Sequence, residues 1–153
     1  MTAISAPIIE VKGQSIEEAL VTGNYTWSSQ KYDSRRPSQQ IFPYDSSLIG
    51  KWEFRFIHSQ RVPLTQSAIS LCMKDDWEPG KLEHLLAFES SSFPDLQKGG
   101  AIVALASRYK HEGFYCIPDL LYSVPERKLQ LNWWPGGFGG HCRFLSVRRV
   151  LES

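Results

Sequence analysis

The chain has 153 residues, 42% of which are hydrophobic, and a formal net charge of +1. This size and hydrophobic content fit a single domain spanning residues 1–153 and exclude a globally disordered chain. The charge is unevenly distributed, because residues 1–95 carry a net −3 and residues 96–153 a net +4. A basic second half is compatible with an acidic partner, although an imbalance of this size also fits ordinary surface variation.

Neither a membrane span nor an export signal is evident. No apolar run reaches the roughly 18 residues that cross a bilayer. Residues 1–13 lack the basic start, apolar stretch and cleavage site of a signal peptide. The cysteines, Cys72, Cys116 and Cys142, are odd in number and have no C-x-x-C spacing, which is typical of reduced thiols inside a cell. We therefore expect a cytoplasmic protein that does not associate with membranes.

The N-terminal part predicts a strand followed by a short helix. Residues 7–12 have the composition of a strand, which Gly13 ends. Ser15 and Glu18 have capping-box spacing, in which each side chain bonds the backbone amide of the other at a helix start. Residues 22–47 form a loop-rich excursion, but its five aromatic rings lead us to expect that much of it lies against the body of the protein.

The middle of the chain predicts two strands and one ambiguous segment. Aromatic residues alternate with polar ones over residues 51–59, which predicts a half-buried strand. Residues 68–76 also alternate, so we predict a second strand there. Residues 81–89 carry leucines at helical spacing, but nine residues do not distinguish a helix from a strand.

Residues 96–153 resemble a β meander, because short apolar stretches alternate with Gly, Pro and Asp. Pro118 and Pro125 are expected to separate strands. Overall we predict an α+β protein that is predominantly antiparallel β, with a small barrel-like or strongly bent sheet and one or two short helices. The order of a Lys-Gly-Gly turn, an apolar strand and hairpins resembles that of SH3-like small barrels, an architectural similarity that implies no function.

The segment Trp134–Gly140 is the most distinctive stretch of the sequence. Four glycines after Pro135 are typical of a turn, here a wide hairpin loop leading into the last strand. A turn alone does not explain the rings of Trp134 and Phe138. If both rings are exposed, they form a contact surface on a loop. The residues that we assign to this surface are Trp134, Gly137, Phe138, Gly139, His141 and Arg143. The sequence thus favours a non-enzymatic protein-interaction module, whose partner and oligomeric state it leaves unknown.

Single-stranded nucleic acid is the first alternative partner. Cations interleaved with aromatic residues are typical of proteins that bind phosphates and stack bases. The cations concerned are Arg108, Lys110, Arg127, Lys128, Arg148 and Arg149. Against this alternative, neighbours such as Arg148 and Arg149 point to opposite faces of a strand, and no RNP-type pattern is present.

A small cysteine-dependent hydrolase or transferase is the second alternative. Its nucleophile would be Cys142, with His111 as a candidate base. His141 is badly placed for that role, because adjacent strand residues project to opposite faces. No nucleophile motif is present, and free cysteine is often buried, with Cys142 sharing a face with Phe144. The histidines and cysteines also lack zinc-site spacing, so we expect no metal and no cofactor.

Overall fold

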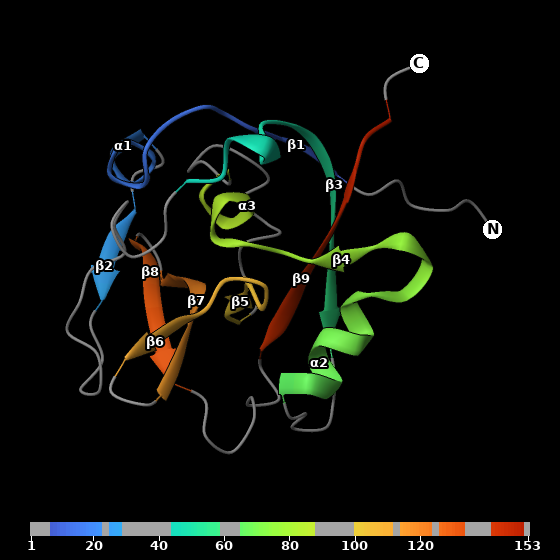
Figure 1. Ribbon diagram of the computed structural model, residues 1–153. Helices are drawn as coiled ribbons and strands as arrows, with labels where there is room; N and C mark the ends of the chain where they lie inside the picture. The colour runs from blue at the N-terminus through green and yellow to red at the C-terminus, as the bar shows by residue number, and fades with distance from the viewer. Residues whose placement is uncertain are drawn as a thin grey trace.

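The computed structural model describes residues 7–22, 25–28, 44–58, 65–87, 100–111, 114–123, 126–133 and 142–151. Over these residues the protein has an α+β fold in which one strongly curled, nine-stranded sheet carries three short α-helices (Figure 1). Six of the strand pairs are antiparallel, and β2–β8 and β5–β9 are parallel. The predicted fold class is therefore confirmed.

The bounds of the elements, in chain order, are as follows. The strands are β1 (Ile8–Val11), β2 (Thr26–Ser28), β3 (Gly50–His58), β4 (Glu78–Pro79), β5 (Ile102–Val103), β6 (Tyr109–His111), β7 (Phe114–Ser123), β8 (Glu126–Trp133) and β9 (Arg143–Arg149). The helices are α1 (Ile16–Thr22), α2 (Thr65–Cys72), α3 (Leu82–Leu86) and the 3-10 turns η1 (Ser46–Leu48) and η2 (Lys74–Asp76). The sheet order is β1-β3-β9-β5-β7-β8-β2, with β4 paired to β9 and β6 to β7.

The middle of strand β9, Phe144 to Val147, is buried on both faces. Leu145 and Val147 belong to the larger hydrophobic cluster, which also contains residues of β3, α1 and α3. Phe144 and Cys142 belong to a second cluster on the other face, together with residues of α2. Because its middle residues pack in both clusters, β9 is a firmly held strand from which the half-buried Arg143 and Arg148 and the exposed Arg149 project.

Two strands and the capping box predicted for the N-terminal half are confirmed. The expected strands over residues 7–12 and 51–59 are β1 and β3. The capping box forms as predicted, since Ser15 N donates to Glu18 Oε1 over 3.1 Å and Glu18 N donates to Ser15 Oγ over 3.1 Å. The ambiguous residues 81–89 contain the helix α3.

The predicted strand over residues 68–76 is wrong, because α2 covers its first part. Ala68 and Cys72 are one helical turn apart, and both are fully buried against the second cluster. Apolar residues in this segment recur both at every second position and at i, i+4 spacing. The pattern is therefore compatible with a strand and with a helix. Ser146 Oγ donates to the carbonyl of Cys72 over 2.7 Å and thereby satisfies the end of the helix.

Pro118 does not separate two strands, because β7 runs through it. The register with β5 explains how. Ala104 N donates to the carbonyl of Pro118 over 3.0 Å, so the backbone groups of Pro118 face β5. Its nitrogen, which carries no proton, therefore donates no hydrogen bond to β5. The ladder with β5 accordingly ends after Ile102 and Val103, and β5 is only these two residues long.

The glycine-rich segment does not link two paired strands. In the sheet, β8 lies between β7 and β2, whereas β9 lies between β3 and β5. The interpretation of this segment as a hairpin loop is therefore wrong, because the chain crosses from one side of the β5–β7 pair to the other. The last strand of the expected meander over residues 96–153 lies beside β3 of the N-terminal half.

Candidate functional site

A pocket of about 660 Å³ lies where β9 ends, and we call it the β9 pocket. Its lining residues come from β3, η2, β4 and the end of β9, and they are Trp52, Glu53, Asp76, Glu78, Arg148, Arg149 and Leu151. The lining thus combines two arginines, three carboxylates and a tryptophan. Arg148 and Arg149 were candidate residues from the sequence, but for phosphate contacts rather than for a mixed-charge pocket.

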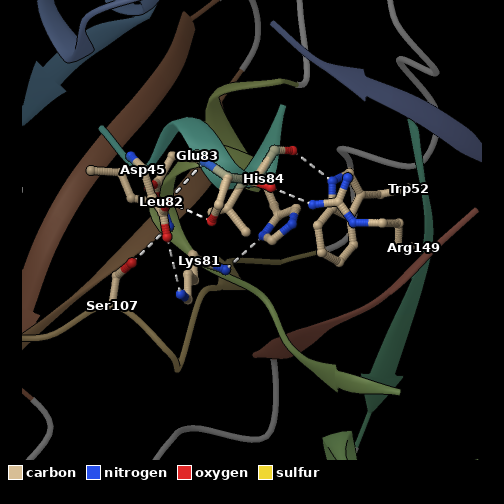
Figure 2. A network of polar contacts seen from close by, with 10 residues as sticks. Asp45, Trp52, Lys81, Leu82, Glu83, His84, Ser107 and Arg149 are labelled. Atoms are coloured by element: carbon tan, nitrogen blue, oxygen red, sulfur yellow. Dashed lines mark hydrogen bonds and ion pairs between the residues drawn. The ribbon is translucent and has the colours of Figure 1, made fainter. Parts of the chain in front are cut away.

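Arg149 is held flat against one wall of the pocket. Its guanidinium carbon lies 4.4 Å from the ring centroid of Trp52. Its NH1 and NH2 groups donate to the carbonyls of Ile49 (3.2 Å) and Ser47 (2.5 Å). Trp52 is itself anchored by a 2.8 Å bond from Nε1 to the carbonyl of Leu48. These contacts fix the direction of the cation, and Figure 2 shows Arg149 beside Trp52.

Arg148 lies on the opposite face of β9, as strand geometry predicts. Its Nε and NH2 donate to the two carboxylate oxygens of Glu53 over 3.2 and 3.3 Å. The guanidinium carbons of Arg148 and Arg55 lie 4.6 and 4.5 Å from the ring centroid of Trp77. A forked pair of this kind orients the guanidinium and neutralises much of its charge.

The opposite wall of the pocket is acidic. Asp76 and Glu78 are exposed, and no ion pair to either carboxylate occurs among the residues that the structure describes. Asp75 and Asp76 have φ values of 59° and 68°, a left-handed conformation that aspartate tolerates better than most residues. With these two residues the chain turns before it enters β4.

His84 lies beside Trp52, one of the residues that line the pocket (Figure 2). It is completely buried, and its ring makes an edge-on contact to Trp52 with the centroids 4.5 Å apart. Burial, with smaller contributions from the cations Lys81 and Arg149, lowers the pKa of His84 to about 3. Its Nδ1 accepts a 3.0 Å bond from Lys81 N, so the neutral ring carries its proton on Nε2. In the sequence, only the three-residue spacing of Lys81 and His84 points to this role.

A polar network links η1 to α3. It thereby holds the backbone around η1, whose carbonyls accept the hydrogen bonds of Arg149. Asp45 N donates to Glu83 Oε2 over 2.9 Å, and Lys81 Nζ lies 3.8 Å from Asp45 Oδ2. Hydrogen bonds from Ser47 hold the pKa of Asp45 below its usual value. Leu82 N donates to Ser107 Oγ over 2.8 Å at the start of α3 (Figure 2).

The loop residues predicted to bind a partner are mostly outside the described residues. Trp134, Gly137, Phe138, Gly139 and His141 all lie there. Arg143 is described and half-buried. Its NH2 donates to the carbonyl of Gly100 over 3.1 Å and its guanidinium carbon lies 5.2 Å from the ring centroid of Phe56. Burial lowers the pKa of Arg143. These contacts brace the beginning of β9.

The predicted nucleic-acid cations are distributed over separate strands. Arg127 is only 2% exposed and stacks on Tyr25 at 4.2 Å, so phosphate access to it is poor. Arg108 is exposed and Lys128 is half-buried. The side chain of Lys110 lies outside the described residues. Of the described cations in this set, the structure brings together Arg148 and Arg149 on β9, whereas Arg127 and Lys128 lie on β8, beyond β5 and β7.

None of the three cysteines is in a disulfide, and each is at most 2% exposed. Burial raises the pKa of the Cys72 thiol to about 12. Cys142 packs in the second cluster with Phe144, on the shared face that its position predicted. His111 lies on β6, which pairs with β7 and not with β9. The structure therefore does not bring the strand of the candidate base beside that of the candidate nucleophile.

No family model, curated protein or solved structure matches this chain significantly. Among the described residues, no three His, Cys, Asp or Glu side chains are grouped so that they could hold a metal ion. In the same part of the chain, each helix is too short or too polar to cross a bilayer.

Proposed function

We propose that this protein is a non-enzymatic protein-interaction module and that the β9 pocket forms part of its contact surface. The observation that carries the proposal is the ordered, charged lining of this pocket. Arg149 stacks on Trp52, and Arg148 forms a bidentate ion pair with Glu53. Arginine and tryptophan dominate the binding energy of many protein interfaces. The buried, reduced cysteines support a cytoplasmic location, which is part of the proposal.

Preorganisation of the lining supports binding. Ordering a long side chain at an interface costs roughly 0.5–1.5 kcal/mol. Arg148 and Arg149 are already ordered by stacking and hydrogen bonds in the free protein, so a partner that contacts them avoids most of this cost. A pocket of about 660 Å³ is large enough to take several atoms of a partner chain rather than a single ion.

A protein partner is favoured over nucleic acid by the charges around the pocket. A phosphate backbone would meet Asp76 and Glu78 on the acidic wall, and Arg148 is already neutralised by Glu53. Binding to a phosphate chain requires several available cations along one path. A protein surface, in contrast, can supply both signs of charge.

The glycine-rich loop is the second proposed part of the contact surface. Trp134 and Phe138 precede Arg143, the first residue of β9, whereas the pocket lies at the last residue of that strand. The seven residues of β9 span roughly 20 Å between Arg143 and the pocket. One partner could contact both, but variants in each region can be tested separately.

The proposal is tested by comparing partner capture by four forms of the purified full chain. The forms are the wild type, a pocket variant carrying Glu78→Lys and Arg149→Glu, a loop variant carrying Trp134→Ala and Phe138→Ala, and the control Glu17→Lys on the exposed surface of α1. Captured proteins are identified by mass spectrometry, and the affinity of the strongest partner is measured by calorimetry.

We expect the pocket variant to weaken binding of that partner at least tenfold, while Glu17→Lys leaves it unchanged. All four forms should unfold cooperatively, with only small differences in the midpoint of unfolding. A partner that binds the wild type and the pocket variant equally would exclude the β9 pocket. Loss of binding in the loop variant alone would then place the interaction on the glycine-rich loop.

A further inference from the structure

The backbone of β9 has an outer edge that successive elements cover. Arg143 N donates to the carbonyl of Ala101 over 2.8 Å, and the carbonyl of Leu145 accepts from Gly80 N over 2.8 Å. Val147 pairs with Glu78 of β4. The odd-numbered residues of β9 thus direct their amide and carbonyl groups to this edge, first toward β5 and then toward β4.

The even-numbered residues direct these groups to β3. Val150 N, just past the strand, donates to the carbonyl of Lys51 over 3.0 Å, in register with the β3–β9 ladder. By this alternation, the backbone groups of Arg149 and the amide of Leu151 point to the outer edge. Among the described residues, no strand pairs with β9 on that side beyond Val147.

Within the described ranges no segment covers this part of the edge, because the chain turns before β4 begins. Continuing the register of β4 by two residues would place Asp76 opposite Arg149. Asp76 and Asp75 instead have the positive φ values of a tight turn, which ends the extended conformation. In Figure 1 the segment before β4 bends away from β9. Both Asp76 and Arg149 line the β9 pocket, so the space between them is the pocket itself.

We infer that the β9 pocket receives a short extended segment of a partner protein, which adds to the outer edge of β9 beside Arg149 and Leu151 as a further strand. This inference rests on the proposed function and specifies how the partner is recognised. Backbone hydrogen bonds to a free sheet edge provide affinity, and the side chains on either side of that edge provide selectivity.

The charges around the edge specify the chemistry of the segment. Arg149 donates to two carbonyls but contacts no carboxylate among the described residues, while Asp76 and Glu78 have no cationic partner there. A carboxylate on the segment opposite Arg149 pairs with its guanidinium. A lysine or arginine of the segment pairs with Asp76 or Glu78. The pocket therefore fits an extended segment that carries both an acidic and a basic side chain.

A second copy of this chain fits the edge less well. Among the described residues, four, 148–151, extend beyond the last pair with β4, which corresponds to roughly 13 Å of strand. An edge of this length forms few backbone hydrogen bonds, whereas stable interfaces between folded proteins bury on the order of 1,000 Å² or more. A short linear segment matches the available length.

The experiment uses a display library of random heptapeptides, selected against the full chain. The best peptide is synthesised, and its Kd is measured for wild type, Leu151→Pro and Leu151→Ala. Leu151→Pro removes the outward amide proton, restricts Leu151 and Val150 to extended backbone, and is compatible with the bond from Val150 N to Lys51. Leu151→Ala is the matched control, because it shortens the same 91% exposed side chain but keeps the amide.

The peptide is also methylated at one backbone nitrogen at a time. We expect selected peptides to contain both Asp or Glu and Lys or Arg, and Leu151→Pro to raise Kd roughly three- to tenfold, as the loss of one hydrogen bond does. Leu151→Ala should leave Kd within twofold. Methylation should weaken binding at alternate nitrogens only, because every second amide of a strand faces its neighbour.

Several outcomes would overturn the inference. In one such outcome, Glu78→Lys weakens peptide binding, Leu151→Pro does not, and methylation has no alternating effect. The peptides then bind the pocket in another way, and the proposed function is unaffected. Peptides insensitive to every pocket substitution, or a failure to select any peptide, overturn strand addition, and partner capture by the four forms above then decides the proposed function separately. A concentration-dependent dimer that Leu151→Pro abolishes would show that a second copy occupies the edge.

Discussion

Trp52 and His84 form an edge-to-face pair whose ring centroids lie 4.5 Å apart at an interplanar angle of 78°. Trp52 is 3% exposed and carries Arg149 on its outer side, while His84 is fully buried beneath it. The pair links α3, where His84 is held by Lys81 N, to the wall of the β9 pocket. The arrangement of the pocket therefore depends on a neutral histidine in the core.

Stability is predicted to fall as the pH decreases below about 6.5. The pKa of His84 is lowered to about 3 in the folded protein, so the unfolded chain binds a proton between these two pH values and the folded protein does not. Each pH unit in this range costs at most about 1.4 kcal/mol of unfolding free energy. His84→Phe keeps an aromatic ring against Trp52 but removes the titration.

The measurement is urea unfolding of the wild type and His84→Phe between pH 7 and pH 4. We expect a shallower pH dependence for the variant, even if its stability at pH 7 is lower because Lys81 N loses its acceptor. His58 is exposed, so His58→Phe serves as the control and should retain the steep dependence. Parallel curves for wild type and His84→Phe would contradict the prediction.

Gly80 is required by the close approach of β4 to β9. A Cβ at this position would lie 2.6 Å from both Cγ and Cδ2 of Leu145, which is fully buried and has no room to move. Gly80→Ala should destabilise the protein by about 1–3 kcal/mol, as overpacking of a tight core does. Gly13→Ala is the control, because its Cβ would meet only the flexible end of Ile49 at 3.1 Å.

A double-mutant cycle distinguishes this clash from a general effect of alanine. Leu145→Ala alone should cost about 2–5 kcal/mol by creating a cavity. If Gly80 and Leu145 are in contact as described, the double variant should cost less than the sum of the two single variants. Additive losses in chemical unfolding would mean that the two positions do not share this space.

The parts of the fold that sequence reasoning found are those that short segments determine. The capping box needs only Ser15 and Glu18, and β3 shows a clear alternation within nine residues. The segment containing α2 was misassigned because the contact that distinguishes its conformation, from Ser146 to the Cys72 carbonyl, spans 74 residues. No local pattern contains that information.

The β9 pocket was not predictable for the same reason. The pairing of Arg148 with Glu53 spans 95 residues, and that of Arg149 with Ser47 spans 102 residues. Sequence reasoning identified both arginines and their opposite directions, but it could not identify their partners. The sequence also offered no means of placing β9 between β3 and β5, which is what brings Trp52, Asp76 and Arg149 together.

Ser146 is predicted to be the main polar link between β9 and α2. Its hydroxyl donates to the Cys72 carbonyl over 2.7 Å and accepts from Arg55 Nε over 3.1 Å, and it is fully buried. Ser146→Ala leaves a buried carbonyl without its donor, which costs about 1–3 kcal/mol. Ser70→Ala is the matched control, since its exposed hydroxyl bonds only the Gln66 carbonyl within the same helix. Equal losses for the two variants in thermal unfolding would be inconsistent with this assignment.

The three thiols are predicted to react slowly in the folded protein. Thiolate is the reactive form, and burial raises the pKa of Cys72 to about 12, so almost no thiolate exists near neutral pH. Cys116 and Cys142 are 2% and 1% exposed, which denies access to a reagent. Alkylation by iodoacetamide at pH 7.5, followed by peptide mass spectrometry, should show little modification of any cysteine within the time that fully modifies the protein in denaturant. Rapid and selective alkylation of Cys142 in the native protein would instead support the cysteine-dependent enzyme and count directly against an interaction module without chemistry of its own.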